Sequence, residues 1–368
     1  MEAQIATALE VCDYKQAARL LKQWQASEPT NPLLRLYAAQ LQEKTNRLEA
    51  AEKNYLKLLK QSPNNRVMGQ ARTGLQRVQE QQSLQKSTAL QRARETDGGD
   101  EPAILAIAAP PLPQREQAIK GISQVFNLDL YTARQKVPNA GFRLYRAGTW
   151  GETNYYRQVL EKKNVLTLSA KIEDIKSLQT FQICYFEELS QPTVVCKNNE
   201  GQIGKIAFCW SEVSARAMGQ LPIFEQVVDL APWGKTKHKE QVQDYIQVVD
   251  FHLLDRGIVL RLCDRLYKYQ QGSKLSAQRE LNSRILWNQL IAQISAVTRG
   301  PQYNDFTRFG EGALEFIDLL PAIAPNLDID RRAPSQWDVA FQLYSGLCYF
   351  NYSKLSTADR TTADGDAV

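Results

Sequence analysis

Two stretches of the chain, YKQAARLLKQWQASEPTN at residues 14–31 and LEAAEKNYLKLLKQSPNN at residues 48–65, align with each other at a single shift of 34 residues. The shift pairs Ala17 with Ala51, Leu21 with Tyr55, and Pro29 with Pro63. In both stretches apolar residues recur three and four apart, the spacing of one buried helix face. A small residue lets two helices cross closely, a bulky one fills the groove beside the crossing, and proline ends a helix. The sequence therefore predicts a repeated helical hairpin.

This pattern resembles the tetratricopeptide repeat (TPR), whose period is 34 residues. The resemblance implies that Ala17 and Ala51 lie at helix crossings, that Leu21 and Tyr55 fill the adjacent grooves, and that Pro29 and Pro63 close the second helices. The Trp-Leu-Gly-Tyr signature of the family is replaced in the second repeat by Arg35, Ala38, Ala39 and Gln42. A polar helix rich in Gln and Arg is expected at 66–94, as a degenerate third repeat or a cap. Residues 1–95 are thus predicted to be TPR-like hairpins.

The helical pattern stops at ETDGGDEP, residues 95–102, and we expect a linker at 96–102. From 103 to 178 strand-like and helix-like segments alternate in the order β-α-α-β-α-β. That order resembles the C-terminal domain of the ribosomal stalk protein and the related Clp adaptor fold. Asp129 is expected to cap a short helix within this small α/β domain.

Residues 179–300 are expected to form an antiparallel β module with a closing helix, similar to a pleckstrin-homology domain. C-terminal helices are expected within 301–355, at 312–323 and 336–350, and a disordered tail at 356–368. The fold class is therefore multidomain α+β. The sequence of the whole chain, including RLCDRLYKY at 261–269 and WDVAFQLYSGL at 337–347, also resembles an uncharacterised family of cyanobacterial TPR proteins. That resemblance implies no activity.

Residue types that carry enzyme chemistry are sparse. The chain has two histidines, His238 in a charged stretch and His252 in an alternating strand, and both are expected to be structural. Its six cysteines form no CxxC pair, and no glycine-rich phosphate-binding motif is present. We therefore expect no enzyme, no metal site and no cofactor.

Bulk composition indicates a cytoplasmic chain with a mild basic excess. The net charge is +5, and the starting residues MEAQIATALEV lack the pattern of a signal peptide. No run approaches the roughly 20 apolar residues that a membrane helix needs. Cysteines inside apolar stretches are typical of a reducing compartment.

The expected function is that of a scaffold or adaptor that binds a partner protein through the TPR groove. Arg35, Tyr37 and Gln42 are the candidate groove residues, and Arg143, Trp150 and Arg157 form a second candidate surface. A regulatory RNA- or ribosome-associated binder, using the basic helix 66–94 and the segment 143–157, stays open as the alternative. Self-association also stays open, because repeat stacks usually need three or more units.

Overall fold

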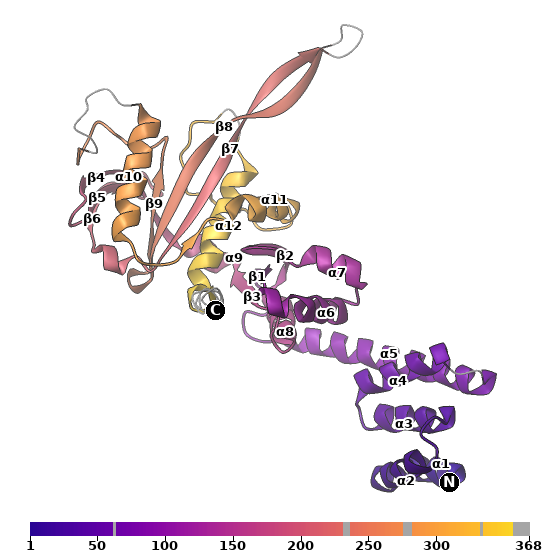
Figure 1. Ribbon diagram of the computed structural model, residues 1–368. Helices are drawn as coiled ribbons and strands as arrows, with labels where there is room; N and C mark the ends of the chain where they lie inside the picture. The colour runs from indigo at the N-terminus through magenta and orange to yellow at the C-terminus, as the bar shows by residue number, and fades with distance from the viewer. Residues whose placement is uncertain (62–63, 231–235, 275–281, 332–333, 356–368) are drawn as a thin grey trace. The chain divides into compact units, whose positions relative to one another are not determined.

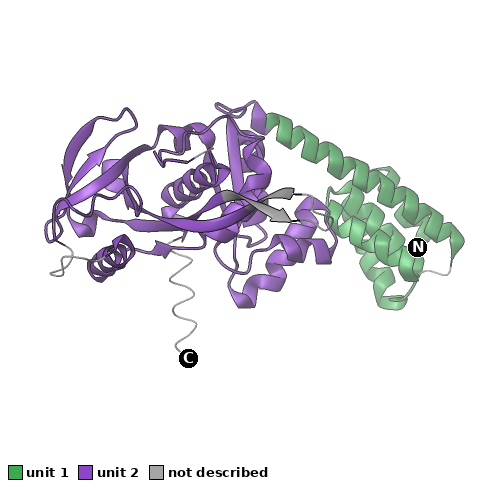
Figure 2. Cartoon of the chain, turned by 90° about the horizontal axis from the view of Figure 1, so that it is seen from above, with its two compact units in different colours: residues 1–92 green, residues 93–368 purple. Residues whose placement is uncertain are grey.

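The computed structural model describes residues 1–61, 64–230, 236–274, 282–331 and 334–355. The chain divides into two compact units, residues 1–92 and residues 93–368 (Figure 2). Pro63 and the tail 356–368, for which a helix-closing role and disorder are predicted, lie outside the described residues. Each unit has its own core.

The first unit is built from helices. They are α1 (Glu2–Glu10), α2 (Tyr14–Ser27), α3 (Pro32–Lys44), α4 (Leu48–Gln61) and α5 (Asn65–Arg94), of which α5 runs past the unit boundary (Figure 1). Local signals start these helices: the Asp13 carboxylate accepts from the Gln16 N–H ahead of α2, and the Asn31 side chain accepts from the Leu33 N–H ahead of α3. The predicted N-terminal helical repeats are confirmed as the hairpins α1–α2 and α3–α4.

Close packing between the helices of this unit depends on small residues. Ala17 and Ala51 are fully buried, and Tyr55 of α4 is as well. The Tyr55 ring lies against Gly74 of α5, where an added Cβ would lie 2.4 Å from the ring. The Tyr55 hydroxyl donates to Glu43 of α3 at 2.7 Å. The large residue of the repeat therefore joins three successive helices.

The second unit contains a small sheet whose element order is the predicted β-α-α-β-α-β. Its strands β1 (Pro102–Ala108), β2 (Phe142–Thr149) and β3 (Thr167–Lys171) are antiparallel in the order β2-β1-β3. The intervening helices are α6 (Arg115–Phe126), α7 (Leu130–Lys136) and α8 (Trp150–Glu161), with α9 (Ile172–Ser177) after β3. Asp129 caps α7 as expected. The likeness to the stalk-protein and Clp adaptor fold stays a prediction.

The expected linker 96–102 is a hydrogen-bonded turn of this second unit. The Gly99 N–H donates to the Thr96 carbonyl at 2.8 Å, and the Gly99 carbonyl accepts from Gly151 at the start of α8 at 2.8 Å. An added Cβ on Gly99 would lie 2.3 Å from the Arg94 carbonyl oxygen. The glycines that suggest a flexible linker in sequence permit this close backbone approach in the structure.

A larger sheet follows, and it is mostly antiparallel. Its strands are β4 (Gln179–Glu188), β5 (Thr193–Lys197), β6 (Ile203–Ala207), β7 (Ala215–Leu230), β8 (Thr236–Leu253), β9 (Ile258–Cys263) and β10 (Gln302–Tyr303), in the order β10-β7-β8-β9-β4-β5-β6. The pairs β10–β7 and β4–β9 are parallel. Strands β7 and β8 pair along their whole length and extend beyond their neighbours as a two-stranded ribbon (Figure 1). The likeness to a pleckstrin-homology domain stays a prediction.

Two helices cover opposite faces of the larger sheet. On one face Trp287, Leu290 and Ile294 of α10 (Ser283–Val297) are buried. On the other face α12 (Gln336–Phe350) is buried from Ala340 to Cys348, in a cluster that includes residues of both sheets. The described parts of 103–178, 179–300 and 301–355 therefore share one core.

Helix α11 (Phe306–Ile317) begins and ends six residues before the predicted helix 312–323. Its glycines explain the difference. An added Cβ on Gly310 would lie 2.6 Å from the Trp337 ring, and one on Gly312 would lie 3.2 Å from Arg143 Nε. Both glycines are therefore required inside the helix by tertiary contacts, although in sequence they suggest a break before it.

Candidate partner-binding site

The first helices of the repeats, α1, α3 and α5, are linked by a polar row. The Tyr37 hydroxyl on α3 donates to Glu2 Oε1 on α1 at 3.3 Å. Burial raises the pKa of Tyr37, the Glu2 carboxylate raises it further, and the positive charge of Arg66 on α5 opposes both. Glu2, Tyr37 and Arg66 therefore lie close enough to interact, although they come from three different helices.

Arg35 and Gln42 lie against the second helix of their own hairpin. Arg35 Nη1 donates to Gln61 Oε1 of α4 at 3.0 Å, and Asn54 Nδ2 of α4 donates to Gln42 Oε1 at 2.8 Å. The two residues are seven apart, so they share one face of α3. Of the three candidate groove residues, Tyr37 alone takes part in the row across the first helices.

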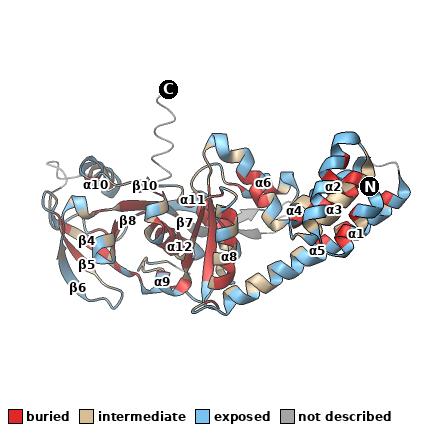
Figure 3. Ribbon diagram, turned by 90° about the horizontal axis from the view of Figure 1, so that it is seen from below, coloured by how far each residue is buried: buried red, intermediate tan, exposed pale blue. Residues whose placement is uncertain are grey.

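Residues that sequence reasoning did not single out share a face with Tyr37 and Arg66. Gln40 and Lys44 follow Tyr37 at helical spacing on α3, and Gln70 and Thr73 follow Arg66 in the same way on α5. All four are half-buried or exposed. Figure 3 shows that much of α5 is exposed. We call this set the first-helix face: Glu2, Tyr37, Gln40, Lys44, Arg66, Gln70 and Thr73. The helical spacing of these residues is visible in the sequence. The face that they share could be recognised only once the buried residues Leu36 and Ala39 had fixed the orientation of α3.

A second set of polar contacts fixes α3, α4 and α5 beside the first-helix face. Arg77 Nε of α5 donates to Glu43 Oε1 at 2.8 Å, and Glu43 also accepts from Tyr55. Burial alone would raise the pKa of Glu43, but the hydrogen bonds from Arg77 and Tyr55 outweigh it and hold that pKa below its usual value. Arg77, a cation of the predicted basic helix, is therefore committed to an internal ion pair.

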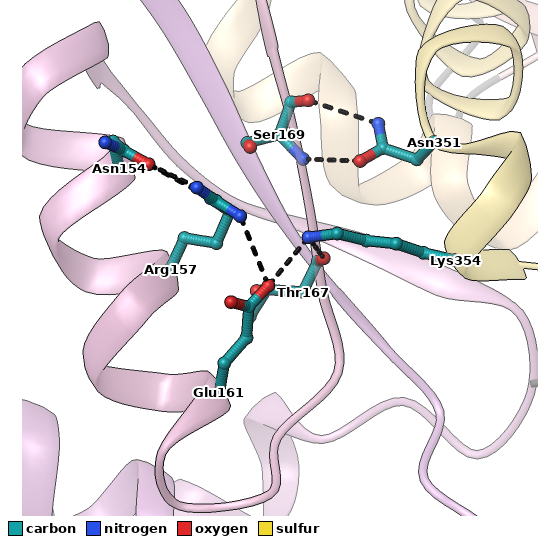
Figure 4. Close-up of polar contacts among 7 residues, drawn as sticks. All are labelled: Asn154, Arg157, Glu161, Thr167, Ser169, Asn351 and Lys354. Atoms are coloured by element: carbon teal, nitrogen blue, oxygen red, sulfur yellow. Dashed lines mark hydrogen bonds and ion pairs between the residues drawn. The ribbon is translucent and has the colours of Figure 1, made fainter.

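The second candidate surface is divided between two elements, β2 and α8. Arg143 lies beside Gly312 of α11, and the Trp150 ring lies 5.7 Å from Lys171 Nζ. Arg157 Nη2 donates to Asn154 Oδ1 at 2.6 Å, and its other terminal nitrogen faces Glu161 (Figure 4). Trp150 and Arg157 are seven positions apart on one face of α8, whereas Arg143 on β2 lies beside α11. Whether the three act as one binding surface stays a prediction.

A Ser-His-Asp grouping is present at the centre of the second unit. Ser345 Oγ of α12 donates to Asp250 Oδ2 at 2.5 Å and lies 2.9 Å from His252 Nε2. The serine stands between the other two residues, whereas in a hydrolytic triad the histidine does. Because the serine proton goes to Asp250, the Nε2 position of His252 must donate, so it cannot accept the serine proton.

Burial and charge also bear on the role of this grouping. Asp250 and His252 are fully buried, and burial, aided by Arg261, lowers the pKa of His252 to about 4 against the opposing effect of Asp250. Arg261 forms a bidentate pair with Asp250 at 2.7 and 2.6 Å. The contacts tie α12 to strands β8 and β9. The side chain of His238, the other histidine, lies outside the described residues.

The described ranges contain neither a cluster of metal ligands nor a helix that could span a membrane. Within the part of the chain that the structure describes, no three or more His, Cys, Asp or Glu side chains are grouped as metal ligands would be. Among the same residues, none of the helices has the length and apolar character required to cross a bilayer.

Comparison with known proteins gives one match. Residues 8–75 match the family model described as tetratricopeptide repeat, and this range spans the end of α1, all of α2, α3 and α4, and the first turns of α5. No curated protein and no solved structure matches the chain. Repeats of this kind generally mediate protein–protein interaction. The chain is therefore a TPR-containing protein, with its repeats at residues 8–75.

Proposed function

We propose that this protein is a non-catalytic adaptor of the cytoplasm that binds a segment of a partner protein on the first-helix face of its repeats. The observation that carries the proposal is the hydrogen bond from Tyr37 of α3 to Glu2 of α1, since it joins the first helices of successive repeats. The charge of Arg66 on α5 acts on the same hydroxyl. Stacked repeats present their first helices as one extended concave surface, which suits a helix or an extended peptide.

The chemistry of the first-helix face indicates what kind of segment it accepts. Gln40, Gln70 and Thr73 offer uncharged donors and acceptors, while Lys44 and Arg66 add positive charge. Tyr37 supplies a half-buried ring that packs with Trp24, their centroids 6.3 Å apart. Rigid aromatic groups with adaptable polar neighbours are the usual anchors of peptide binding. The partner segment is therefore expected to be polar with at least one apolar anchor.

The non-catalytic part of the proposal rests on the geometry of the second unit. Its Ser-His-Asp grouping is buried, and the Ser345 hydroxyl donates its proton to Asp250, whereas a nucleophilic serine would donate it to the histidine. Asp338, whose carboxylate accepts from Arg331 Nη2 at 2.7 Å, is another buried acid committed to an internal partner. These side chains are accounted for by packing, so we assign binding to the first unit.

The test uses the full-length chain with a photo-crosslinking amino acid at single positions. Placed at Gln40 or Gln70, it lies on the first-helix face, whereas at Ala26 it lies on the exposed side of α2. We expect one partner protein to be crosslinked from both face positions in nuclease-treated cell extract, and not from Ala26. The crosslinked peptides, mapped by mass spectrometry, should come from one continuous segment of that partner.

A blocking variant provides the matched comparison. Gln40→Arg with Gln70→Arg fills the first-helix face, and Gln23→Arg with Ala26→Arg adds the same charge to the exposed side of α2. The first pair should reduce recovery of the crosslinked partner at least tenfold, and the second should leave it unchanged. Equal recovery with both pairs would show that the partner binds elsewhere.

A further inference from the structure

The basic excess of the chain is confined to the repeat unit. Residues 1–92 contain fourteen Lys and Arg against eight Asp and Glu, whereas the complete chain has a net charge of only +5. The second unit is therefore close to neutral. A local excess of one sign, and not the net charge of the chain, is what a charged partner encounters first.

Much of this excess lies in two matching rows on the second helices. Lys15, Arg19 and Lys22 on α2 recur at steps of four and three, and so do Lys53, Lys57 and Lys60 on α4. All six are exposed. We call the six residues the lysine face.

The lysine face lies opposite the buried residues of each helix. On α2 the buried residues are Ala17, Leu21 and Trp24, and on α4 they are Leu48, Ala51, Tyr55 and Leu58. The 34-residue shift superposes Arg19 on Lys53, so the row on α4 lies one turn further along its helix than the row on α2. Because stacking repeats one unit onto the next, the two rows present the same face of the stack, away from the first-helix face.

The charges of the lysine face are not neutralised within the chain. In the described ranges none of the six makes an ion pair or a side-chain hydrogen bond. One acidic neighbour is present: Glu49 stands four residues before Lys53 on α4, whereas the row on α2 has no acidic residue at this spacing. Like charges three and four apart on a helix repel one another. The rows are thus kept against a local electrostatic penalty, which an anionic partner would relieve.

We propose that the lysine face binds the phosphate backbone of a nucleic-acid duplex without reading its sequence. Exposed ion pairs with an acidic peptide contribute little each, because water and salt screen them. A nucleic-acid backbone has a far higher charge density than an acidic peptide, and each phosphate that is neutralised releases condensed counterions. The same six cations therefore give a much more favourable binding free energy with a nucleic acid. Lysine suits this role because it is a point charge without the geometric demands of a guanidinium.

The remaining exposed positions favour a duplex over a single strand. Among the described residues between and beside the cations are Ala18, Gln23, Ala26 and Leu56, and the aromatic ring of Tyr14, next to Lys15, packs against the core of the first hairpin. Proteins that hold single strands stack bases on such rings, whereas duplexes are held through their phosphates. The lysine face therefore matches backbone contact without base contact.

The experiment measures binding of full-length protein to a fluorescent duplex of about 20 base pairs and to a single strand of equal length, by anisotropy at several salt concentrations. With four to six phosphates contacted, log affinity should fall with log salt at a slope of about −4 to −5. A fourfold rise in salt should then lower affinity by roughly 10²- to 10³-fold. The single strand should bind more weakly than the duplex.

Two variants assign the effect to the lysine face. Lys15→Gln, Arg19→Gln and Lys22→Gln should reduce the slope by about two to three, and adding Lys53→Gln, Lys57→Gln and Lys60→Gln should abolish salt-dependent binding. The control removes three exposed cations from the second unit: Lys120→Gln, Arg284→Gln and Arg308→Gln. Glutamine is nearly as good a helix former as lysine, and circular dichroism should confirm unchanged helicity.

The proposal is overturned if the control loses as much affinity as the α2 variant, since net charge alone would then explain binding. It is also overturned if the sixfold variant keeps the wild-type slope, or if polyglutamate or phosphatidylserine vesicles bind more tightly than the duplex at equal salt. Crosslinking from Gln40 reports the first-helix face independently, because the sixfold variant leaves that face intact.

Discussion

The side-chain amide of Asn351 pairs with both backbone groups of Ser169: its oxygen accepts from the Ser169 N–H at 3.3 Å, and its nitrogen donates to the Ser169 carbonyl at 3.1 Å (Figure 4). Ser169 lies on β3, an edge strand of the small sheet. Lys354 Nζ lies 3.4 Å from the next outward carbonyl, that of Thr167. The residues after α12 thus satisfy a strand edge that would otherwise be open to another chain.

Asn351→Ala should destabilise the second unit by about 2–4 kcal/mol, because it leaves the Ser169 N–H and carbonyl without these partners. Hydrogen exchange at the Ser169 amide measures this directly and is not confused by unfolding of the repeats. Asn351→Asp, which keeps the acceptor and loses the donor, should give a smaller increase in exchange. Unchanged exchange in both variants would show that the edge is protected by something other than Asn351.

Because Asp250 and Arg261 form a buried ion pair, we expect the stability losses caused by substituting each of them to be strongly non-additive. Asp250→Asn should cost about 3–5 kcal/mol, because it leaves the Arg261 guanidinium, 1% exposed, without its counter-charge. The double variant Asp250→Leu with Arg261→Met should cost much less than the sum of its single changes, since it removes both charges. A double-mutant cycle by urea denaturation, followed through the tryptophans of the second unit, provides the measurement. Additive losses would argue against a direct pair.

Two buried groups of the second unit, Asp338 and His252, are expected to make its stability depend on pH in opposite directions, so that the two effects largely cancel. Burial raises the pKa of Asp338 to about 6, against the opposing charges of Arg331 and Arg261, and burial lowers the pKa of His252 to about 4. Asp338 binds its proton more tightly when folded, so its contribution to stability is lost as pH rises from about 4 to 6. His252 binds its proton less tightly when folded, so its contribution is lost as pH falls from 6.5 to about 4.

Each of these two pKa shifts corresponds to about 3 kcal/mol in the free energy of unfolding. We therefore expect the stability of the wild-type second unit to change little between pH 4 and 6. Asp338→Asn should reveal a stability that increases with pH in this window, and His252→Gln one that decreases. Chemical denaturation at half-unit pH intervals tests both signs, and parallel pH profiles for the two variants would refute the assignment.

Two glycines of α5 provide a matched pair for the packing of the repeats. An added Cβ on Gly69 meets nothing within 4 Å, so Gly69→Ala should stabilise the helix by about 0.5–1 kcal/mol. An added Cβ on Gly74 would overlap the Tyr55 ring, so Gly74→Ala should destabilise the unit by about 1–3 kcal/mol. Thermal unfolding monitored at 222 nm should shift in opposite directions. Shifts of the same sign would mean that Tyr55 does not pack on Gly74 in solution.

The parts of the fold that depend on neighbouring residues could be predicted from the sequence. The 34-residue spacing identified the hairpins because the contacts of Ala51 and Tyr55 are made between consecutive helices. Asp129 could be recognised as a cap because it bonds to residues two and three positions on. The burial of α12 between two sheets could not be predicted, since it depends on strands more than a hundred residues earlier in the chain.

The candidate site shows the same limit. Arg35 and Tyr37 are two positions apart on α3, so their side chains point to opposite sides of the helix. Both residues were candidates for the groove because they are polar. The side of α3 that meets α4 can be told from the side that meets α1 only from the orientation of α3, which buried Leu36 and Ala39 fix. The lysine face was visible in sequence only as scattered basic residues, because its meaning depends on which side of each helix is buried.

The position of α12 also sets the order of events during synthesis. The strands of the small sheet, complete at Lys171, share their core with a helix that ends at Phe350. At about 5–20 residues per second, ribosomes need roughly 10–35 s to make the chain between these two points. The repeats, which contain their own core, can form long before then. The newly made sheet must meanwhile keep one apolar face uncovered, so the nascent second unit is expected to depend on a chaperone such as a ribosome-bound holdase until its last helix emerges.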